Sequence, residues 1–172
     1  ISLTGSTMRM QNAIRGWRTQ QPTVKMKIIN VPNDGSIYIG GDTFLNPDNS
    51  RRYVYALLNL TSDRGARFFT ISVPPGSVVT DIYFNDVDSH SGEPYDTTDW
   101  AIEIDGAQGL VRWSTDTYDI DEDANALRWG SMFSFWFDAD EPLDGVVHTL
   151  DLFKPGTPQQ VDQVDVPFLD PA

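Results

Sequence analysis

Short runs in which apolar and polar residues alternate, separated by turn-forming residues, are the feature that most constrains this chain. The alternation has a period of two, which is typical of a half-buried β-strand. Turn signals recur at roughly the 8–12-residue spacing of sandwich folds, among them Asn33-Asp34-Gly35 and Pro74-Pro75-Gly76. The sequence therefore predicts an all-β fold, an antiparallel β-sandwich or jelly-roll-like architecture with about nine short strands and little helix.

The expected strands share this alternation and lie between turn clusters. They cover Thr23–Pro32, Ser36–Gly40, Arg52–Leu60, Arg67–Val73, Val78–Asn85, Trp100–Ile104, Leu110–Ser114, Leu127–Phe137 and Val146–Phe153. In the first strand, Val24, Met26 and Ile28 are expected to form the buried face. The segment Met8–Trp17 is the one place where a short helix is expected.

Charge is distributed unevenly along the chain. Seven of the 12 Lys and Arg residues lie in residues 1–52, together with only three of the 25 acidic residues, so a basic leading segment precedes an acidic body. Arg9, Arg15 and Arg18 lie in this segment and are candidate interface residues, because cations favour docking on an acidic face of this protein or of a neighbour. The alternative interpretation is an ordinary solvated arm.

Composition sets further limits on organisation and function. We divide the chain into a basic N-terminal arm (residues 1–22), a β-sandwich domain (residues 23–156) and a Pro-rich C-terminal tail (residues 157–172). The formal net charge of −13 argues against nucleic acid as a partner, because phosphate binding needs clustered cations. The absence of Cys excludes disulfides, thiolate metal sites and cysteine nucleophiles. No apolar run approaches the roughly 18 residues of a transmembrane helix.

Three acidic loops are candidate sites of chemistry: residues 86–99, 116–125 and 138–144. Calcium prefers several hard oxygen ligands from a flexible loop, which makes Ca²⁺ the candidate cofactor. The candidate metal ligands are Asp86, Asp88, Asp119, Asp121 and Asp123. The alternative is that these aspartates occupy turns because their side chains bond their own backbone.

An EF-hand is excluded by its own spacing rules. Asp119, Asp121 and Asp123 imitate the start of that loop, which also requires Gly at its sixth position and Glu at its twelfth. This chain has Ala124 and Gly130 at those positions. A calcium site in a sandwich loop remains open.

Weaker signals concern acid–base chemistry and modification. Paired carboxylates could act as in glycosidases, and His90 beside Asp88 could act as a general base, but no Gly-x-Ser-x-Gly motif accompanies them. His148 alternates with apolar residues and is expected to be a partly buried strand residue. The triplet at residues 59–61 matches a glycosylation sequon at the end of an apolar strand.

Aromatic side chains are a further candidate site, because rings can stack on sugars. The aromatic set is Tyr83, Tyr95, Trp100, Trp113, Tyr118, Trp129 and Trp136. Alternation places Phe133, Phe135 and Phe137 in the core and Trp136 on the opposite face, so Trp136 is the leading candidate for an exposed or interface aromatic. Core packing is the alternative role for the set as a whole.

Several blocks resemble a family of uncharacterised secreted bacterial proteins. They are the turn Pro74–Gly76, the loop Asp86–Trp100 (DVDSHSGEPYDTTDW), the segment Asn125–Asp140 (NALRWGSMFSFWFDAD) and Leu152–Gly156 (LFKPG). The similarity spans residues 53–158. It implies export, a β-rich domain and no known catalysis.

The resemblance also directs attention to residues within its blocks. His90, Glu93, Tyr95 and Arg128 are candidate ligand or interface residues, and Arg128 is expected to pair with a carboxylate of the first loop and seal one end of the sandwich. The chain departs from the family at Trp136, where an Arg is usual, and in the basic segment that precedes the similarity.

These observations lead to two functional expectations. The first is a non-catalytic structural or interaction subunit of an extracellular or cell-surface assembly, which contacts itself or other surface proteins through its N-terminal arm or its strand edges. The alternative is a secreted glycan-binding module assisted by calcium. Neither expectation assigns a catalytic residue.

Overall fold

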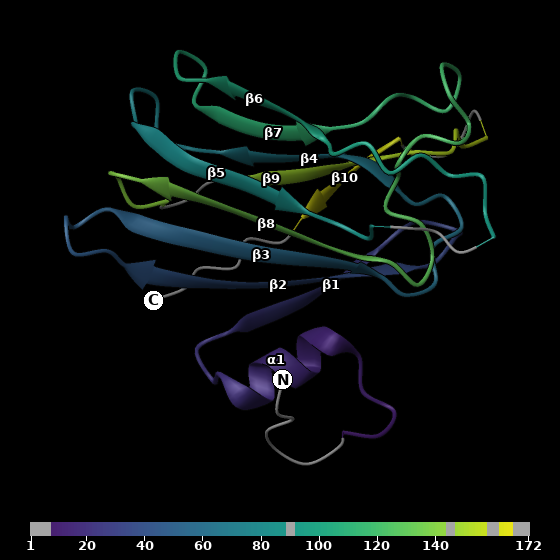
Figure 1. The fold of residues 1–172 in the computed structure, drawn as a ribbon, viewed down its shortest axis with the longest axis horizontal. Coiled ribbons are helices and arrows are strands. Elements are labelled where there is room, and N and C mark those ends of the chain that lie inside the picture. Colours follow the sequence, from purple (N-terminus) through teal and green to yellow (C-terminus); the bar gives the residue numbers. More distant parts are fainter. Residues whose placement is uncertain (1–7, 89–91, 144–146, 158–161, 167–172) are drawn as a thin grey trace.

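The computed structural model describes residues 8–88, 92–143, 147–157 and 162–166. It is an all-β sandwich with one short helix, as the alternation predicted (Figure 1). The elements are α1 (Ala13–Gln20), β1 (Lys25–Asn30), β2 (Ser36–Leu45), β3 (Arg51–Asn59), β4 (Ala66–Ser72), β5 (Val79–Asn85), β6 (Ala101–Asp105), β7 (Leu110–Ser114), β8 (Met132–Ala139), β9 (His148–Leu152) and β10 (Gln163–Val166).

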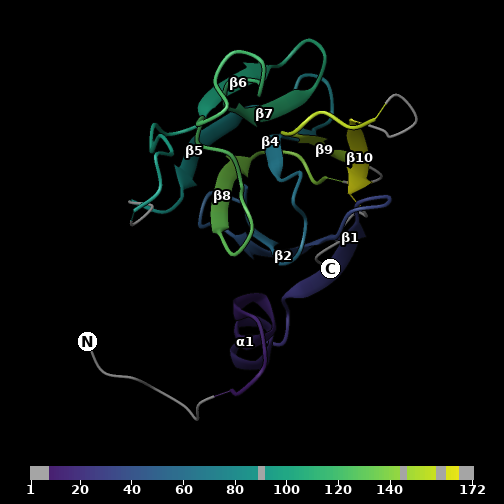
Figure 2. The ribbon, with the colours of Figure 1, turned by 90° about the vertical axis from the view of Figure 1, so that its right-hand side faces the viewer.

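The strands form two five-stranded sheets in which every neighbouring pair is antiparallel. The first sheet has the order β1-β2-β3-β8-β5 and the second has the order β10-β9-β4-β7-β6. The chain crosses from one sheet to the other after β3, β4, β5, β7 and β8, so consecutive strands outside the hairpins lie in different layers. Figure 2 shows the two layers end-on, with α1 outside the first sheet.

The core between the sheets is built from aromatic side chains. Phe133, Phe135 and Phe137 are completely buried, as their alternation in the sequence predicted. The rings of Phe69 and Phe135, from opposite sheets, lie 5.1 Å apart in an edge-to-face arrangement, and Trp113 lies 5.3 Å from Phe135. Contacts of this kind add to the stabilisation from buried apolar area and fix the spacing of the layers.

The described part of the N-terminal arm, residues 8–22, folds back onto the sandwich instead of extending from it. The helix α1 begins after Asn12, whose side chain accepts a hydrogen bond from the Arg15 amide (2.9 Å). Ile14 is buried against the outer face of the first sheet, and a Cβ added at Gly40 would lie 2.6 Å from its Cγ2 atom. The close approach of helix and sheet therefore depends on glycine at position 40.

A buried carboxylate fixes the far end of the arm. Asp42 is 3% exposed, and its Oδ2 atom accepts hydrogen bonds from Gln21, the C-cap of α1, and from Thr23 (2.9 Å). The arm thus docks on its own sheet through polar groups and apolar side chains. Arg15 and Arg18 remain on the exposed face of the helix.

The predicted buried face of the first strand is confirmed for Val24 and partly for Met26, and it is contradicted for Ile28. Ile29 enters the core between the sheets, whereas Met26 lies beneath α1 and Ile28 is 41% exposed. Val24 is buried, although it precedes β1. Alternation correctly separates the two faces of the strand. Near α1, however, the first sheet is covered on both faces, by the helix on one and by the second sheet on the other.

The C-terminal region contributes a strand that the sequence reading had not assigned. Gln163–Val166 forms β10 and pairs with β9, and Val164 and Val166 are buried in the core. Within the described residues, no helix is long and apolar enough to cross a membrane.

The buried His148 predicts a pH dependence of stability. Burial lowers the pKa of this imidazole from 6.5 to about 4, so between these values the unfolded chain binds more protons than the folded one. Stability contributed by the neutral ring should therefore be complete above pH 6.5 and fall as the pH falls toward 4. At pH 5 the loss relative to pH 7 should be about 2 kcal/mol.

Urea unfolding of the wild type and of His148→Phe at both pH values would measure this loss. The ring lies among Tyr55 and Phe69, so phenylalanine preserves the aromatic contacts. The difference between the two proteins isolates the histidine from the titration of the many carboxylates. An equal response of both proteins to pH would contradict the assignment.

Candidate functional site

The first two acidic loops meet at one end of the sandwich. The first connects β5 to β6 and the second connects β7 to β8. The amide of Asp96 donates a hydrogen bond to the carbonyl of Asp123 (2.8 Å), and the side chain of Asn125 donates to Asp86 and to the Thr98 carbonyl (2.9 Å). Segments far apart in sequence are therefore tied into one surface.

Two of the five aspartates proposed as calcium ligands accept hydrogen bonds in these loops. Asp86 accepts from Asn125, and its pKa is raised, chiefly by burial and further by Asp99 and Asp88. Asp121 accepts a hydrogen bond from the amide of Asp123 (2.9 Å), as in the turn interpretation. Asp88 and Asp119 are exposed.

No group of three or more metal-ligating side chains is assembled in the part of the chain that the structure describes. His90 falls outside those residues. The calcium site therefore stays a prediction without a ligand set.

Arg128 seals the loop end, but not through the predicted carboxylate pair. Its guanidinium lies 3.7 Å from the ring centre of Tyr95, and its Nη2 atom donates to the carbonyls of Glu122 (2.8 Å) and Ala124 (3.0 Å). No ion pair joins Arg128 to a carboxylate among the described residues. Burial lowers the pKa of Arg128 from its usual value. The seal joins both loops by cation–π and backbone contacts instead.

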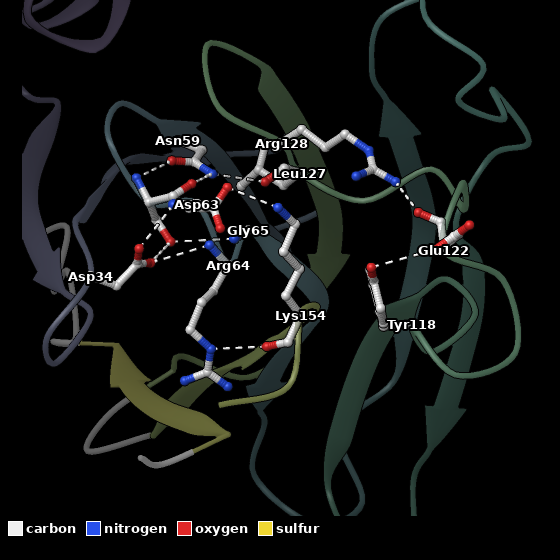
Figure 3. A network of polar contacts seen from close by, with 11 residues as sticks. Asp34, Asn59, Asp63, Arg64, Gly65, Tyr118, Glu122, Leu127, Arg128 and Lys154 are labelled. Carbon is white, nitrogen blue, oxygen red and sulfur yellow. Dashed lines mark hydrogen bonds and ion pairs between the residues drawn. The ribbon is translucent and has the colours of Figure 1, made fainter. Parts of the chain in front are cut away.

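A buried amide holds the base of this end together (Figure 3). The Asn59 side chain donates to the carbonyls of Ser62 (2.9 Å) and Leu127 (3.0 Å) and accepts from the Ser62 amide (2.9 Å). Asn59 has no exposed surface, so the glycosylation sequon that it begins is inaccessible in the folded protein. Its contacts join the end of β3 to the segment that leads into β8.

The turn between β3 and β4 is held by hydrogen bonds to Asp34, in the β1–β2 hairpin. Asp34 accepts hydrogen bonds from the Ser62 hydroxyl (2.5 Å) and from the Asp63 amide (3.0 Å) (Figure 3). Asp63 in turn forms an ion pair with Lys154 (2.8 Å). These contacts place Asp63 and Lys154 at the surface beside the Arg128 segment.

Trp129 projects into solvent from a tight turn at this end. The Ser131 amide donates to the Arg128 carbonyl (3.0 Å), and Gly130 has a φ of 82°, which suits the third position of a type II turn. The Gly130 amide also donates to the Asn59 carbonyl (2.8 Å). Trp129 consequently occupies the second position of an anchored turn, and it is 75% exposed.

A polar pocket of about 420 Å³ lies beside the Trp129 indole. Its lining combines Trp129 and Tyr95 with the charged residues Asp63, Glu93, Arg128 and Lys154. A second hollow of about 240 Å³ is lined by Thr61, Asp63 and Trp129. Trp129 and Asp63 therefore border both hollows.

The structure brings together three of the predicted ligand or interface residues in one pocket and places Trp136 elsewhere. Glu93, Tyr95 and Arg128 line the pocket. Trp136 instead lies on the outer face of the first sheet, where its ring stacks on Tyr83 with centres 3.8 Å apart.

Each ring of the Trp136–Tyr83 pair thus covers one face of the other. Trp129, which sequence reasoning placed only within the general aromatic set, is the ring held in solvent. The sequence signal for this exposure is the glycine directly after Trp129, because glycine permits a turn from which the preceding side chain projects.

Comparisons with models of known protein families, with curated proteins and with solved structures found no match. The candidate site therefore rests on the geometry of this chain.

The buried amide predicts that the loop end is sensitive to Asn59→Ala. This change removes three hydrogen bonds and leaves the buried Leu127 carbonyl without one of its donors, so the free energy of unfolding should fall by about 3 kcal/mol. Urea unfolding measures the change. Asn85→Ala, at an exposed asparagine with one local bond, is the control and should cost less than about 0.5 kcal/mol. Equal costs for both variants would contradict the structural role of Asn59.

Proposed function

We propose that the protein is a non-catalytic glycan-binding module and that the Trp129 pocket is its binding site. The observation that carries the proposal is an indole held 75% exposed by an anchored turn beside a polar hollow. An apolar side chain of this size is normally buried. An exposed ring on an anchored turn, next to hydrogen-bonding groups, suits a ligand with one apolar face and a polar edge.

The charges of the pocket favour a neutral ligand. Asp63 and Glu93 are balanced by Arg128 and Lys154, so the lining has no formal net charge. A phosphate or another anion would meet the two carboxylates, whereas sugar hydroxyls can donate to carboxylates and accept from cations. A neutral oligosaccharide therefore fits this lining better than a nucleotide or an anionic ligand.

An extracellular location accompanies this proposal. The support for it is the resemblance of the loop blocks to secreted bacterial proteins, and polysaccharides are accessible outside the cell. Binding, rather than turnover, is the proposed activity.

Replacing Trp129 should weaken retention on polysaccharide. Trp129→Ala removes the stacking surface and should weaken binding by about tenfold or more, with an unchanged melting temperature because the ring is exposed. Affinity electrophoresis in soluble β-glucan, xylan and mannan, with titration of the matching oligosaccharides, measures the effect.

Trp136→Ala is the matched control, because it also removes a tryptophan side chain, but one that lies outside the pocket on the outer face of the first sheet. It should leave retention unchanged. Absence of retention of the wild type on every polysaccharide, or equal retention of the wild type and Trp129→Ala, would overturn the proposal.

We also propose self-association through the basic arm, because one observation favours it independently. Arg9, Arg15 and Arg18 are exposed on a strongly acidic protein, and none of the three forms an ion pair within the described residues. Lys25 and Lys27 are exposed on the adjacent strand β1. A basic patch of this kind favours contact with the acidic face of a second copy.

Charge reversal on the helix tests this second proposal better than deletion of the arm, which would uncover the surface beneath Ile14. Arg15 occupies the third position of α1, where glutamate favours the helix by acting with the N-cap and the helix dipole. Arg15→Glu should therefore preserve the helix and weaken self-association several-fold in light scattering. Arg51→Glu, which reverses a charge outside the arm, should have a smaller effect. Equal effects of the two variants would contradict a role for the arm.

A further inference from the structure

The four edges of the two sheets differ in how well they are protected against strand addition. An edge strand presents unpaired backbone groups, which proteins usually block with charges, bulges, short length or coverage. The edge strand β1 carries exposed Lys25 and Lys27. The edge strand β10 has only four residues and lies in contact with β1. The edge strand β5 has a register shift near Asp81, whose φ is 48°. These three edges are therefore poor acceptors.

The fourth edge, β6, is also short and carries two acidic residues, Glu103 and Asp105, but it has neither a bulge nor an edge cation. It pairs with β7 along its whole length without a register shift, and it contains no Gly, Pro or Lys. Ile102 and Ile104 lie opposite the fully buried Trp113 and Val111, so they point toward the core side, yet they remain 45% and 49% exposed. The apolar layer between the sheets is thus incomplete at this edge.

The outer side of β6 has the opposite character. Glu103 lies between the two isoleucines and faces Arg112 on β7, with an ion pair of 3.3 Å. Its side chain is 58% exposed. An added strand would complete this edge best with two apolar residues that flank one cation.

The arm contains that pattern at Met8-Arg9-Met10. Met10 is fully exposed and has a φ of 57°, a conformation that costs energy in a residue other than glycine and that a strand would relieve. Arg9 is exposed and forms no ion pair among the described residues. The segment therefore matches β6, because its two methionines can meet the two isoleucines and its arginine can meet Glu103.

We infer that the Met8–Met10 segment of one copy adds as an antiparallel strand to the β6 edge of the next copy. This register sets Arg9 opposite Glu103, Met8 opposite Ile104 and Met10 opposite Ile102. The inference rests on the proposed self-association and names its interface. It is independent of glycan binding.

The positions of the two segments determine the kind of assembly. The arm lies below the first sheet and β6 lies at the opposite side of the second sheet, in both views (Figures 1 and 2). One copy therefore cannot satisfy its own edge. The contact is head-to-tail, because it joins two different surfaces, and its repetition builds a ring or an open chain of copies.

A charge exchange tests the interface. Arg9→Glu and Glu103→Arg should each weaken self-association of the 172-residue protein by about tenfold, because each places like charges opposite one another. The double variant restores an opposite pair and should recover association to within about threefold of the wild type. Light scattering over a concentration series and negative-stain microscopy measure the assemblies.

Apolar substitutions provide the matched test. Ile104→Lys adds an edge-blocking cation to β6 and should remove long assemblies, whereas Ile120→Lys, at an isoleucine 71% exposed in the second acidic loop, should not. Both sites are exposed enough for the variants to fold, which thermal unfolding checks.

The possible results distinguish failure of the β6 interface from failure of the proposed self-association. Restoration by the double variant and loss with Ile104→Lys support the β6 interface. Self-association that is insensitive to these changes, or single defects that the double variant does not restore, overturns the interface alone. A wild-type protein that stays monomeric at every concentration overturns both this interface and the proposed self-association.

Discussion

The buried side chain of Asn59 is the interaction on which the loop end of this molecule depends. One amide group supplies two donors and one acceptor, which meet backbone groups of Ser62 and of Leu127, in two distant parts of the chain. The backbone carbonyl of Asn59 accepts a hydrogen bond from the Gly130 amide, and this bond anchors the turn that carries Trp129. The exposed indole is thus held by contacts behind it.

The fold was largely predictable because each sheet layer has a strong period-two signal. The completely buried Phe133, Phe135 and Phe137 gave the core side of β8 without ambiguity. Alternation does not report which element covers a given face of a strand, and this is why the sequence could not show that Met26 packs beneath α1. The two buried valines of β10 were overlooked because prolines surround so short a strand.

The candidate site was predictable in part, because its residues come from conspicuous loop blocks. Glu93, Tyr95 and Arg128 were selected from two loops that the fold then places together. The partner of Arg128 could not be chosen from sequence, since a carboxylate and an aromatic ring are both good partners for guanidinium. Trp136 was preferred to Trp129 because strand alternation predicts a side-chain face, whereas exposure in a turn depends on tertiary anchoring.

The two proposals occupy different surfaces and reinforce one another physically. The Trp129 pocket contains no residue of the arm or of β6, so association at that edge need not involve the sugar site. A head-to-tail chain of copies would repeat the pocket at a constant spacing. Polysaccharides are repetitive as well, and several weak sites on one rigid array gain affinity through effective concentration. In such an array, a pocket with a single exposed ring would suffice for retention, because the array rather than the individual site would supply the residence time.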